Sequence, residues 1–419
     1  MSSCGARVAS QWDSLAVVNQ NREADSALLF QYPFLNLLSD TIIDPTGSMD
    51  SFRSTLELLG GPQVDSLAVH CSVVHYGDSH IQAGHLSETV MHRLQNQYGN
   101  AGRGTIVPYR LMSSNEPRDY SIRSNTIFER ASIIERSPCC PPGVTGITLK
   151  GPRAGYFFTL RSFVVPEYPN QDYRFNRVVV LHDSLAPMVT AKEELLDTEA
   201  FSDIYNCYST SIDLKEASDS LELYTYAKGD LSTGGIYGFS LENGHSGVLY
   251  HSLGVNSACY LHWGAYPEIA TQSVALQANL IIVSLGTNEA AGGNFIDEVF
   301  YNEIDSFISG LRRANPTVPI LLTTPVENMR SKRRSREVNR NIARVAQTIK
   351  DYGQDHGIAV LDLFEACGGS GSVVKWNEAS MMQRDKIHFT PQGYNIQGLL
   401  IYYALISRNG AGVFLHQKP

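Results

Sequence analysis

Two short segments near opposite ends of the chain carry residue types suited to nucleophilic catalysis. Residues 77–80, Gly-Asp-Ser-His, follow an apolar run and precede a helix-like stretch, which places the Ser79 hydroxyl at a strand-to-helix turn. Asp385 and His388 are three residues apart, a spacing that lets the carboxylate orient the imidazole and leaves the second ring nitrogen free. A serine needs such a base to become a nucleophile. Together these residues predict a serine hydrolase.

A serine that attacks a carbonyl also needs hydrogen-bond donors for the oxyanion that forms. Asn288 follows the predicted strand 279–285, at the edge where the sites of open α/β sheets collect, so its amide is one candidate donor. Gly254 lies just after the middle region and could direct its backbone N–H to the same point. The sequence thus predicts an oxyanion hole formed by Asn288, Gly254 and the backbone N–H of Ser79.

Two of these assignments have an alternative elsewhere in the chain. Asp362, at the end of the predicted strand 358–363, could orient His388 in place of Asp385. Gly102 is an alternative to Gly254. It lies in a glycine-rich segment that follows a predicted helix and lacks a Lys-Ser/Thr ending, so a helix C-terminal turn is predicted there and not a phosphate loop.

Histidines near the nucleophile do not predict a metal site. His75, His80 and His85 recur every fifth residue, but they fall on a strand, a turn and a helix start, so they would not converge on one ion. His80 and Asp78 flank Ser79 and are predicted to line the site. No metal is expected at this position.

The elements that position these residues alternate between strand and helix. A predicted strand, 66–77, leads into the serine turn, and a predicted amphipathic helix, 84–98, follows it. Alternation of this kind implies a parallel sheet covered by helices on both faces. The later predicted elements are strand 279–285, helix 297–314, strand 319–324, helix 335–352, strand 358–363 and helix 391–406.

Between these blocks the pattern changes to short aromatic and β-branched segments separated by turn residues. This pattern predicts an antiparallel β-sandwich inserted into the α/β domain, and loop-closure entropy tolerates such an insertion. The segments are 155–160, 177–181, 221–226 and 235–240. We therefore expect an N-terminal extension, 1–50, packed on the main domain, a discontinuous hydrolase domain, 51–115 and 251–419, and an inserted sandwich, 116–250.

Composition narrows the function classes. The formal net charge of −9 makes nucleic acid an unexpected partner. No apolar run approaches the ~18 residues that a membrane helix requires, so no integral membrane segment is predicted. Residues 1–19 lack the basic region and apolar core of a secretory signal. The seven cysteines contain no CxxC pair, which argues against structural zinc.

Taken in order, the candidate residues form four blocks that resemble those of the SGNH, or GDSL-type, hydrolases. The blocks are Gly-Asp-Ser at 77–79, Gly254, Gly-Thr-Asn at 286–288 and Asp-x-x-His at 385–388. The chain is most similar to the bacterial peptidoglycan O-acetylesterases of this superfamily, through Gly-Asp-Ser-His-Ile, through Gly-Val-Asn-x-Ala and through a β-sandwich like a carbohydrate-binding module between the first two blocks. One departure is Ser257, where the family pattern has glycine.

The resemblance implies a three-layer α/β/α fold without a cofactor. It also implies that Ser79, Asp385 and His388 remove O-acetyl groups from a glycan, most of all peptidoglycan, through an acetyl-enzyme in a periplasmic or extracellular setting. The alternatives are an O-acetylesterase acting on xylan or another polysaccharide, a lipid esterase, and a glycan-binding protein that has lost catalysis. A phosphodiesterase ranks last, because the metal ligands that it would need are not found.

Overall fold

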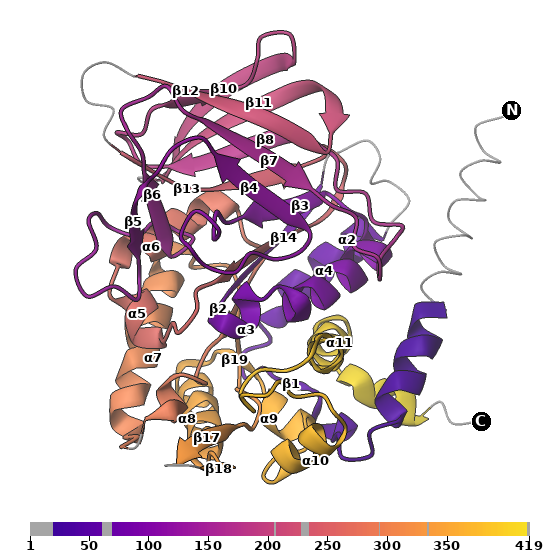
Figure 1. The fold of residues 1–419 in the computed structure, drawn as a ribbon. Coiled ribbons are helices and arrows are strands. Elements are labelled where there is room, and N and C mark those ends of the chain that lie inside the picture. The colour runs from indigo at the N-terminus through magenta and orange to yellow at the C-terminus, as the bar shows by residue number, and fades with distance from the viewer. Residues whose placement is uncertain are drawn as a thin grey trace, which may run out of the picture.

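A six-stranded sheet forms the centre of the α/β part of the molecule (Figure 1), which we describe from a computed structural model. The structure describes residues 20–60, 69–204, 207–227, 234–292, 294–332 and 335–416. The strand order is β1-β19-β16-β15-β2-β14, with β1 antiparallel to β19 and the other strands parallel. The strands are β1 (Ile42–Ile43), β2 (His70–Gly77), β14 (Gly247–Gly254), β15 (Leu280–Ser284), β16 (Ile320–Thr323) and β19 (Ala359–Leu361).

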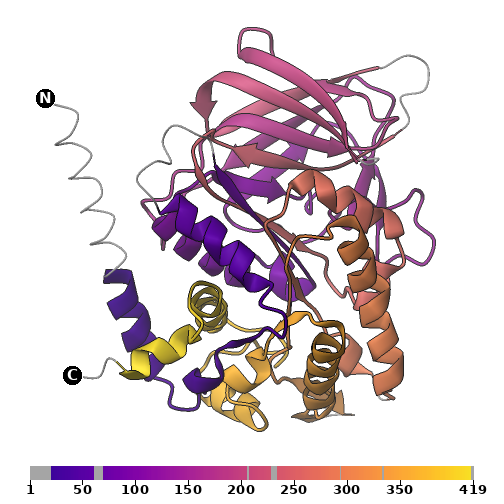
Figure 2. The ribbon, with the colours of Figure 1, turned by 180° about the vertical axis from the view of Figure 1, so that it is seen from behind.

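Helices cover both faces of this sheet, because its central strands are apolar on both sides. In β2, Cys71 and Val73 belong to one buried cluster, whereas Val74 and Tyr76 belong to the other. The first cluster includes side chains of α2 (Met49–Leu59), α4 (His85–Tyr98), α9 (Leu363–Ala366), α10 (Ser372–Glu378) and α11 (Pro391–Ile406). The second includes side chains of α5 (Tyr260–Gly264), α6 (Pro267–Gln272), α7 (Asp297–Ala314) and α8 (Asn341–His356). Figures 1 and 2 show the two helical layers, and the predicted three-layer α/β/α fold is confirmed.

The predicted helix 335–352 is wrong at its start. Its first residues form β18 (Ser335–Val338), which pairs with β17 (Met329–Lys332) in a hairpin, and the helix α8 begins only at Asn341. Arg330 faces Glu337 across the hairpin, and their charged groups lie 2.8 Å apart. A cross-strand ion pair of this kind stabilises a hairpin that the helical pattern of the sequence did not reveal.

Antiparallel strands from the middle of the chain form two further sheets at one end of the molecule (Figure 1). The sheets have the orders β10-β11-β8-β13-β6-β5, with β3 beside β13, and β4-β7-β12-β9. The rings of Phe158 on β7 and Phe239 on β13 lie 5.1 Å apart, so the sheets pack face to face, as a sandwich requires. The strands are β3 (Gly102–Ile106), β4 (Tyr120–Ser124), β5 (Glu129–Ser132), β6 (Ile147–Lys150), β7 (Phe157–Ser162), β8 (Phe175–His182), β9 (Met188–Thr190), β10 (Leu196–Ile204), β11 (Cys207–Ser218), β12 (Ser220–Tyr226) and β13 (Gly235–Glu242).

The glycine-rich segment after α4 is a strand, so the predicted helix C-terminal turn at Gly102 and Gly104 is wrong. The helix instead ends at Gly99, with a φ of 92°. A Cβ atom on Gly102 would lie 2.4 Å from the Leu241 carbonyl oxygen, and one on Gly104 would lie 2.3 Å from that of Tyr250. These glycines therefore let β3 pass close to the backbones of β13 and β14. β3, in the expected hydrolase domain, thus pairs with β13, in the expected inserted sandwich. The domain boundaries remain a prediction.

The N-terminal residues that the structure describes contribute to the α/β part. Residues 20–30 are helical, and Leu29, Leu35 and Leu37 are buried in the same cluster as α4 and α11. The residues before position 20 lie outside the described part of the chain. None of the described helices is long and apolar enough to cross a membrane. The short 3₁₀ helices are η1 (Leu37–Ser39), η4 (Ser273–Leu276), η5 (Glu289–Ala291) and η6 (Gly410–His416).

Candidate active site

The turn after β2 places Ser79 at the carboxyl edge of the parallel sheet. The strand ends at Gly77, and the short helix α3 (Ser79–Gln82) begins two residues later. Asp78 caps this helix, since its Oδ1 atom accepts a hydrogen bond from the His80 N–H at 2.9 Å. A Cβ atom on Gly77 would lie 2.2 Å from Ile81, so only glycine permits so tight a turn. The turn therefore presents Ser79 as the first residue of a helix.

Asp385 and His388 come from the segment that precedes α11; His388 contacts Ser79, and Asp385 contacts His388. The His388 Nε2 and Ser79 Oγ atoms lie 2.8 Å apart, and the His388 Nδ1 and Asp385 Oδ2 atoms lie 2.6 Å apart. The other Asp385 oxygen accepts hydrogen bonds from the backbone N–H groups of Ile387, at 2.9 Å, and His388, at 3.0 Å. The structure thus brings the three predicted residues into one continuous chain of hydrogen bonds.

This environment favours the charged form of Asp385. Burial acts to raise the pKa of its carboxyl group, but the hydrogen bonds from His388 and Ile387 outweigh burial, and the pKa is lowered from its usual value. An ionised carboxylate at this position holds a proton on the Nδ1 atom of His388. The Nε2 atom is then free to accept the proton of Ser79.

The alternative acid, Asp362, has other partners. It lies 2.7 Å from the Lys350 ammonium nitrogen, accepts a hydrogen bond from the Thr324 hydroxyl at 3.0 Å and caps the helix α9. Its position at the end of β19 resembles that of a site residue in sequence, but its contacts stabilise the junction of strand and helix. Asp385, and not Asp362, contacts His388.

Asn288 lies beside the nucleophile turn, as its position after β15 predicts. Its Nδ2 atom donates to the Asp78 Oδ2 atom at 3.2 Å and to the Ala258 carbonyl oxygen at 3.0 Å. Both hydrogens of the amide therefore have acceptors within the protein. An oxyanion bound here would have to share one of them.

Gly254 is placed differently from the prediction. Its N–H donates to the Tyr109 hydroxyl at 3.2 Å, and that hydroxyl donates to the Gly254 carbonyl oxygen at 2.5 Å. The N–H that the sequence analysis assigned to the oxyanion hole thus has a partner in the fold. A Cβ atom at this position would lie 2.2 Å from the Gln82 backbone nitrogen, so glycine is needed for the close packing of β14 against α3. Its alternative, Gly102, lies in β3.

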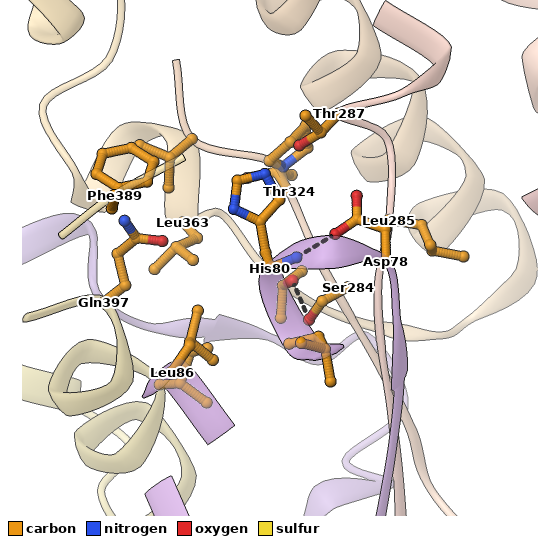
Figure 3. Close-up of a pocket in the computed structure, with 15 residues that line it drawn as sticks. Asp78, His80, Leu86, Ser284, Leu285, Thr287, Thr324, Leu363, Phe389 and Gln397 are labelled. Carbon is orange, nitrogen blue, oxygen red and sulfur yellow. Dashed lines mark hydrogen bonds between the residues drawn. The ribbon is translucent and has the colours of Figure 1, made fainter. Parts of the chain in front are cut away.

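His80 packs beside His388, and the backbone N–H of His80 donates to the Asp78 carboxylate, as Figure 3 shows. The rings of His80 and His388 have centroids 5.1 Å apart, and His80 Nδ1 lies 2.9 Å from the Tyr394 hydroxyl oxygen. Burial lowers the pKa of His80 to about 3, so this ring is neutral. Burial raises the pKa of Asp78 to about 7. Of the two predicted lining residues, His80 is therefore neutral, and Asp78 is readily protonated near neutral pH.

A small cavity of about 40 Å³ lies behind the nucleophile turn (Figure 3). Its wall includes Asp78, His80, Thr324 and Gln397. The Nε2 atoms of His80 and Gln397 are buried and have no hydrogen-bond partner in the part of the chain that the structure describes. Most of the wall is apolar, but the two nitrogen atoms without partners suit a few ordered water molecules, and the cavity is too small for a sugar.

Three residues that contact the site carry no motif in the sequence. They are Tyr109, which contacts Gly254, Tyr394, which contacts His80, and Gln82, which follows Ser79 by one helical turn. Only Gln82 had a signal in the sequence, namely its i+3 spacing from the nucleophile.

Among the described residues, no cluster of three or more potential metal ligands is found.

Part of the chain matches a known protein family. Residues 229–396 match the sequence model of the GDSL-like Lipase/Acylhydrolase family. The match covers Gly254, Asn288, Asp385 and His388 but begins after Ser79, which the inserted strands separate from the other three blocks. A comparison with curated proteins gives no match.

The fold agrees with that of a solved peptidoglycan O-acetylesterase, and two other solved structures match a smaller part of the chain. A peptidoglycan O-acetylesterase superposes with a TM-score of 0.69 at 18% identity, over 86% of this chain and 97% of that chain. A lipase/acylhydrolase from Enterococcus faecalis (TM-score 0.30, 19% identity) covers 37% of this chain and 74% of its own. An acetylxylan esterase from Geobacillus stearothermophilus (TM-score 0.31, 17% identity) covers 38% and 73%.

The predicted resemblance to the SGNH, or GDSL-type, hydrolases is confirmed, and so is the SGNH hydrolase fold. Residues 229–396 therefore resemble a GDSL-like acylhydrolase domain.

Proposed function

We propose that this protein is a serine esterase that removes O-acetyl groups from a glycan, with peptidoglycan as the first candidate. The observation that carries the proposal is the hydrogen-bonded chain from Ser79 Oγ to His388 Nε2, at 2.8 Å, and from His388 Nδ1 to Asp385 Oδ2, at 2.6 Å. Nucleophile, base and orienting acid are within the distances that acyl transfer requires.

The reaction follows from these contacts. Ser79 Oγ attacks the acetyl carbonyl carbon while His388 Nε2 takes the hydroxyl proton, and Asp385 stabilises the imidazolium. The imidazolium then returns the proton to the departing sugar oxygen, which leaves an acetyl group on Ser79. A water molecule, deprotonated by His388, attacks this acetyl-enzyme. Acetate leaves, and Ser79 regains its proton.

The tetrahedral intermediates need donors in the positions where negative charge develops. The backbone N–H of Ser79 lies at the start of α3 and has no acceptor among the described residues. The Asn288 amide, now bonded to Asp78 and Ala258, is the second donor. Gly254 is left out of this role, since its N–H donates to Tyr109. Its part in the proposal is to let β14 approach the nucleophile turn.

The glycan substrate is proposed from the likeness to the peptidoglycan O-acetylesterase structure. That likeness extends over 86% of this chain, so it includes antiparallel strands as well as the α/β part. A cell-wall substrate would place the protein in the periplasm or outside the cell. Residues of the antiparallel sheets would then be available to contact the polymer, as in a carbohydrate-binding module.

The test is acetate release by the wild type and by Ser79→Ala from O-acetylated peptidoglycan, acetylated xylan and p-nitrophenyl acetate. We expect the wild type to release acetate chiefly from peptidoglycan and the variant to lose this activity while it remains folded. Serine-dependent release chiefly from xylan would keep the mechanism and change the substrate. Release that persists in Ser79→Ala would refute the mechanism.

A further inference from the structure

We propose that the side chains of Asn115 and Asn256 form a subsite for a sugar hydroxyl beside Ser79. This inference rests on the proposed glycan esterase function and names residues that would recognise the sugar. The two amides lie on separate segments, the connection between β3 and β4 and the turn after β14, that tertiary contacts bring together.

Gln82 joins both segments to the helix that carries the nucleophile. Its Nε2 atom donates to the Asn115 carbonyl oxygen at 2.9 Å and to the Asn115 Oδ1 atom at 3.1 Å. Its Oε1 atom accepts a hydrogen bond from the Asn256 N–H at 2.8 Å. Gln82 follows Ser79 by three residues in α3, so the side chain that holds both amides comes from the helix that carries the nucleophile.

The contact between the two amides leaves one donor group and one acceptor unused. Asn256 Nδ2 donates to Asn115 Oδ1 at 2.7 Å and to the Ser114 hydroxyl at 3.1 Å. No partner within the described residues is found for the Asn115 Nδ2 donor or the Asn256 Oδ1 acceptor. Asn115 is exposed and Asn256 is half-buried, so both residues are reached by solvent. A sugar hydroxyl both donates and accepts, which matches this neighbouring pair.

The subsite is held in place before any ligand binds. Gln82 is buried, and Tyr109, from the same connection as Asn115, bonds to both backbone groups of Gly254. Side chains that are already ordered lose little conformational entropy on binding. Neither amide carries a charge, so the pair suits a neutral polyhydroxylated ligand better than an anion. These features point to the sugar part of the substrate and not to its acetyl group.

The key variant is Asn115→Asp. It keeps the Oδ1 atom that contacts Gln82 and Asn256, and it replaces the free Nδ2 donor with a charged carboxylate oxygen that can only accept. We expect its KM for O-acetylated peptidoglycan fragments to rise about tenfold with kcat little changed, because one hydrogen bond to substrate is lost. Hydrolysis of p-nitrophenyl acetate, which has no sugar, should stay within about twofold of wild type. Asn115→Ala and Asn256→Ala should act in the same direction.

Asn302→Ala, which removes an exposed amide from α7, is the matched control and should change neither substrate. An equal loss on both esters would overturn the inference, because the amides would then only position the catalytic groups. An unchanged KM for the glycan ester would also overturn it. In both cases the wild type still cleaves glycan esters in a Ser79-dependent way, and the proposed function stands. A wild type that hydrolyses only p-nitrophenyl acetate would overturn both proposals.

Discussion

The candidate site has two halves that are built in different ways. The base half holds the acid and the base, and the oxyanion half holds the donors proposed for the negative charge. Asp385 and His388 lie in one short segment, and the carboxylate bonds to the imidazole and to two backbone N–H groups of that segment. The proposed oxyanion half joins separate parts of the chain, Ser79 in α3 and Asn288 after β15. Gly254, at the end of β14, packs against α3 but donates its N–H to Tyr109. Local contacts therefore set the geometry of the first half, whereas packing between distant segments sets that of the second.

This difference teaches what a motif can and cannot determine. A three-residue spacing fixes the distance between an acid and a base almost by itself. A glycine matched by its order in the chain carries no such constraint. Its N–H is free to take any nearby acceptor, and here it takes Tyr109.

The largest effect should come from the base half. Asp385→Asn should lower kcat by a factor of ~10³ to 10⁴, because the amide favours the wrong tautomer of His388. Steady-state kinetics on an acetyl ester, with circular dichroism to check folding, would measure this loss. Asp362→Asn is the matched control. It should keep activity within about twofold and lose some thermal stability with the Lys350 ion pair. The reverse pattern would identify Asp362 as the orienting acid.

The next largest effect should come from the amide of the oxyanion half. Asn288→Ala removes a donor that is proposed to stabilise the transition state, so kcat should fall by ~10² with a smaller change in KM. Kinetics on p-nitrophenyl acetate would show this split. A kcat that stays near the wild-type value would exclude Asn288 from the oxyanion hole and leave it as a residue that holds Asp78 and Ala258.

A smaller effect on activity should follow from the contact between Tyr109 and Gly254. Tyr109→Phe leaves two buried backbone groups without a partner, which should cost ~1–3 kcal/mol of stability. We expect a lower Tm and an approximately tenfold fall in kcat as the end of β14 shifts. Tyr352→Phe removes a hydroxyl that bonds to Asp305, and it should lower the Tm without changing kcat. An increase in kcat for Tyr109→Phe would instead indicate that the freed Gly254 N–H joins the oxyanion hole.

The smallest effect concerns stability and pH in the segment after Asn288. Burial raises the pKa of Glu289 to about 8, from 4.5. The folded protein thus keeps this proton at pH values where the unfolded chain has lost it, and stability falls as the pH rises from 4.5 through about 8. Glu289→Gln cannot titrate. The Tm of Glu289→Gln minus the Tm of the wild type should therefore be larger at pH 8.5 than at pH 5. The change should correspond to a stability difference on the order of 1 kcal/mol or more.

Glu298→Gln, an exposed position on α7, is the control for the pH experiment. The difference in Tm between this variant and the wild type should be the same at both pH values. If the Tm difference for Glu289→Gln is equally independent of pH, the carboxyl group is not held protonated in the folded state.

Much of the α/β part could be predicted from sequence because its signals are local. The helices α7 and α11 match the predicted ranges 297–314 and 391–406. Thr390 caps α11 and Pro391 begins it, and both residues act through their immediate neighbours. The hairpin of β17 and β18 could not be predicted in the same way. Its pairing across a turn competes with a helical pattern and depends on cross-strand contacts.

The sequence by itself determined which residue types could do chemistry, their order along the chain and the short-range spacing of Asp385 and His388. The tertiary structure alone decided three further points. Ser79 lies within hydrogen-bond distance of His388, Asp362 pairs with Lys350 and Thr324, and the Gly254 N–H donates to Tyr109. The physical reason is that a hydrogen bond forms between whatever groups packing brings together. Separation along the chain does not encode that proximity beyond a few residues.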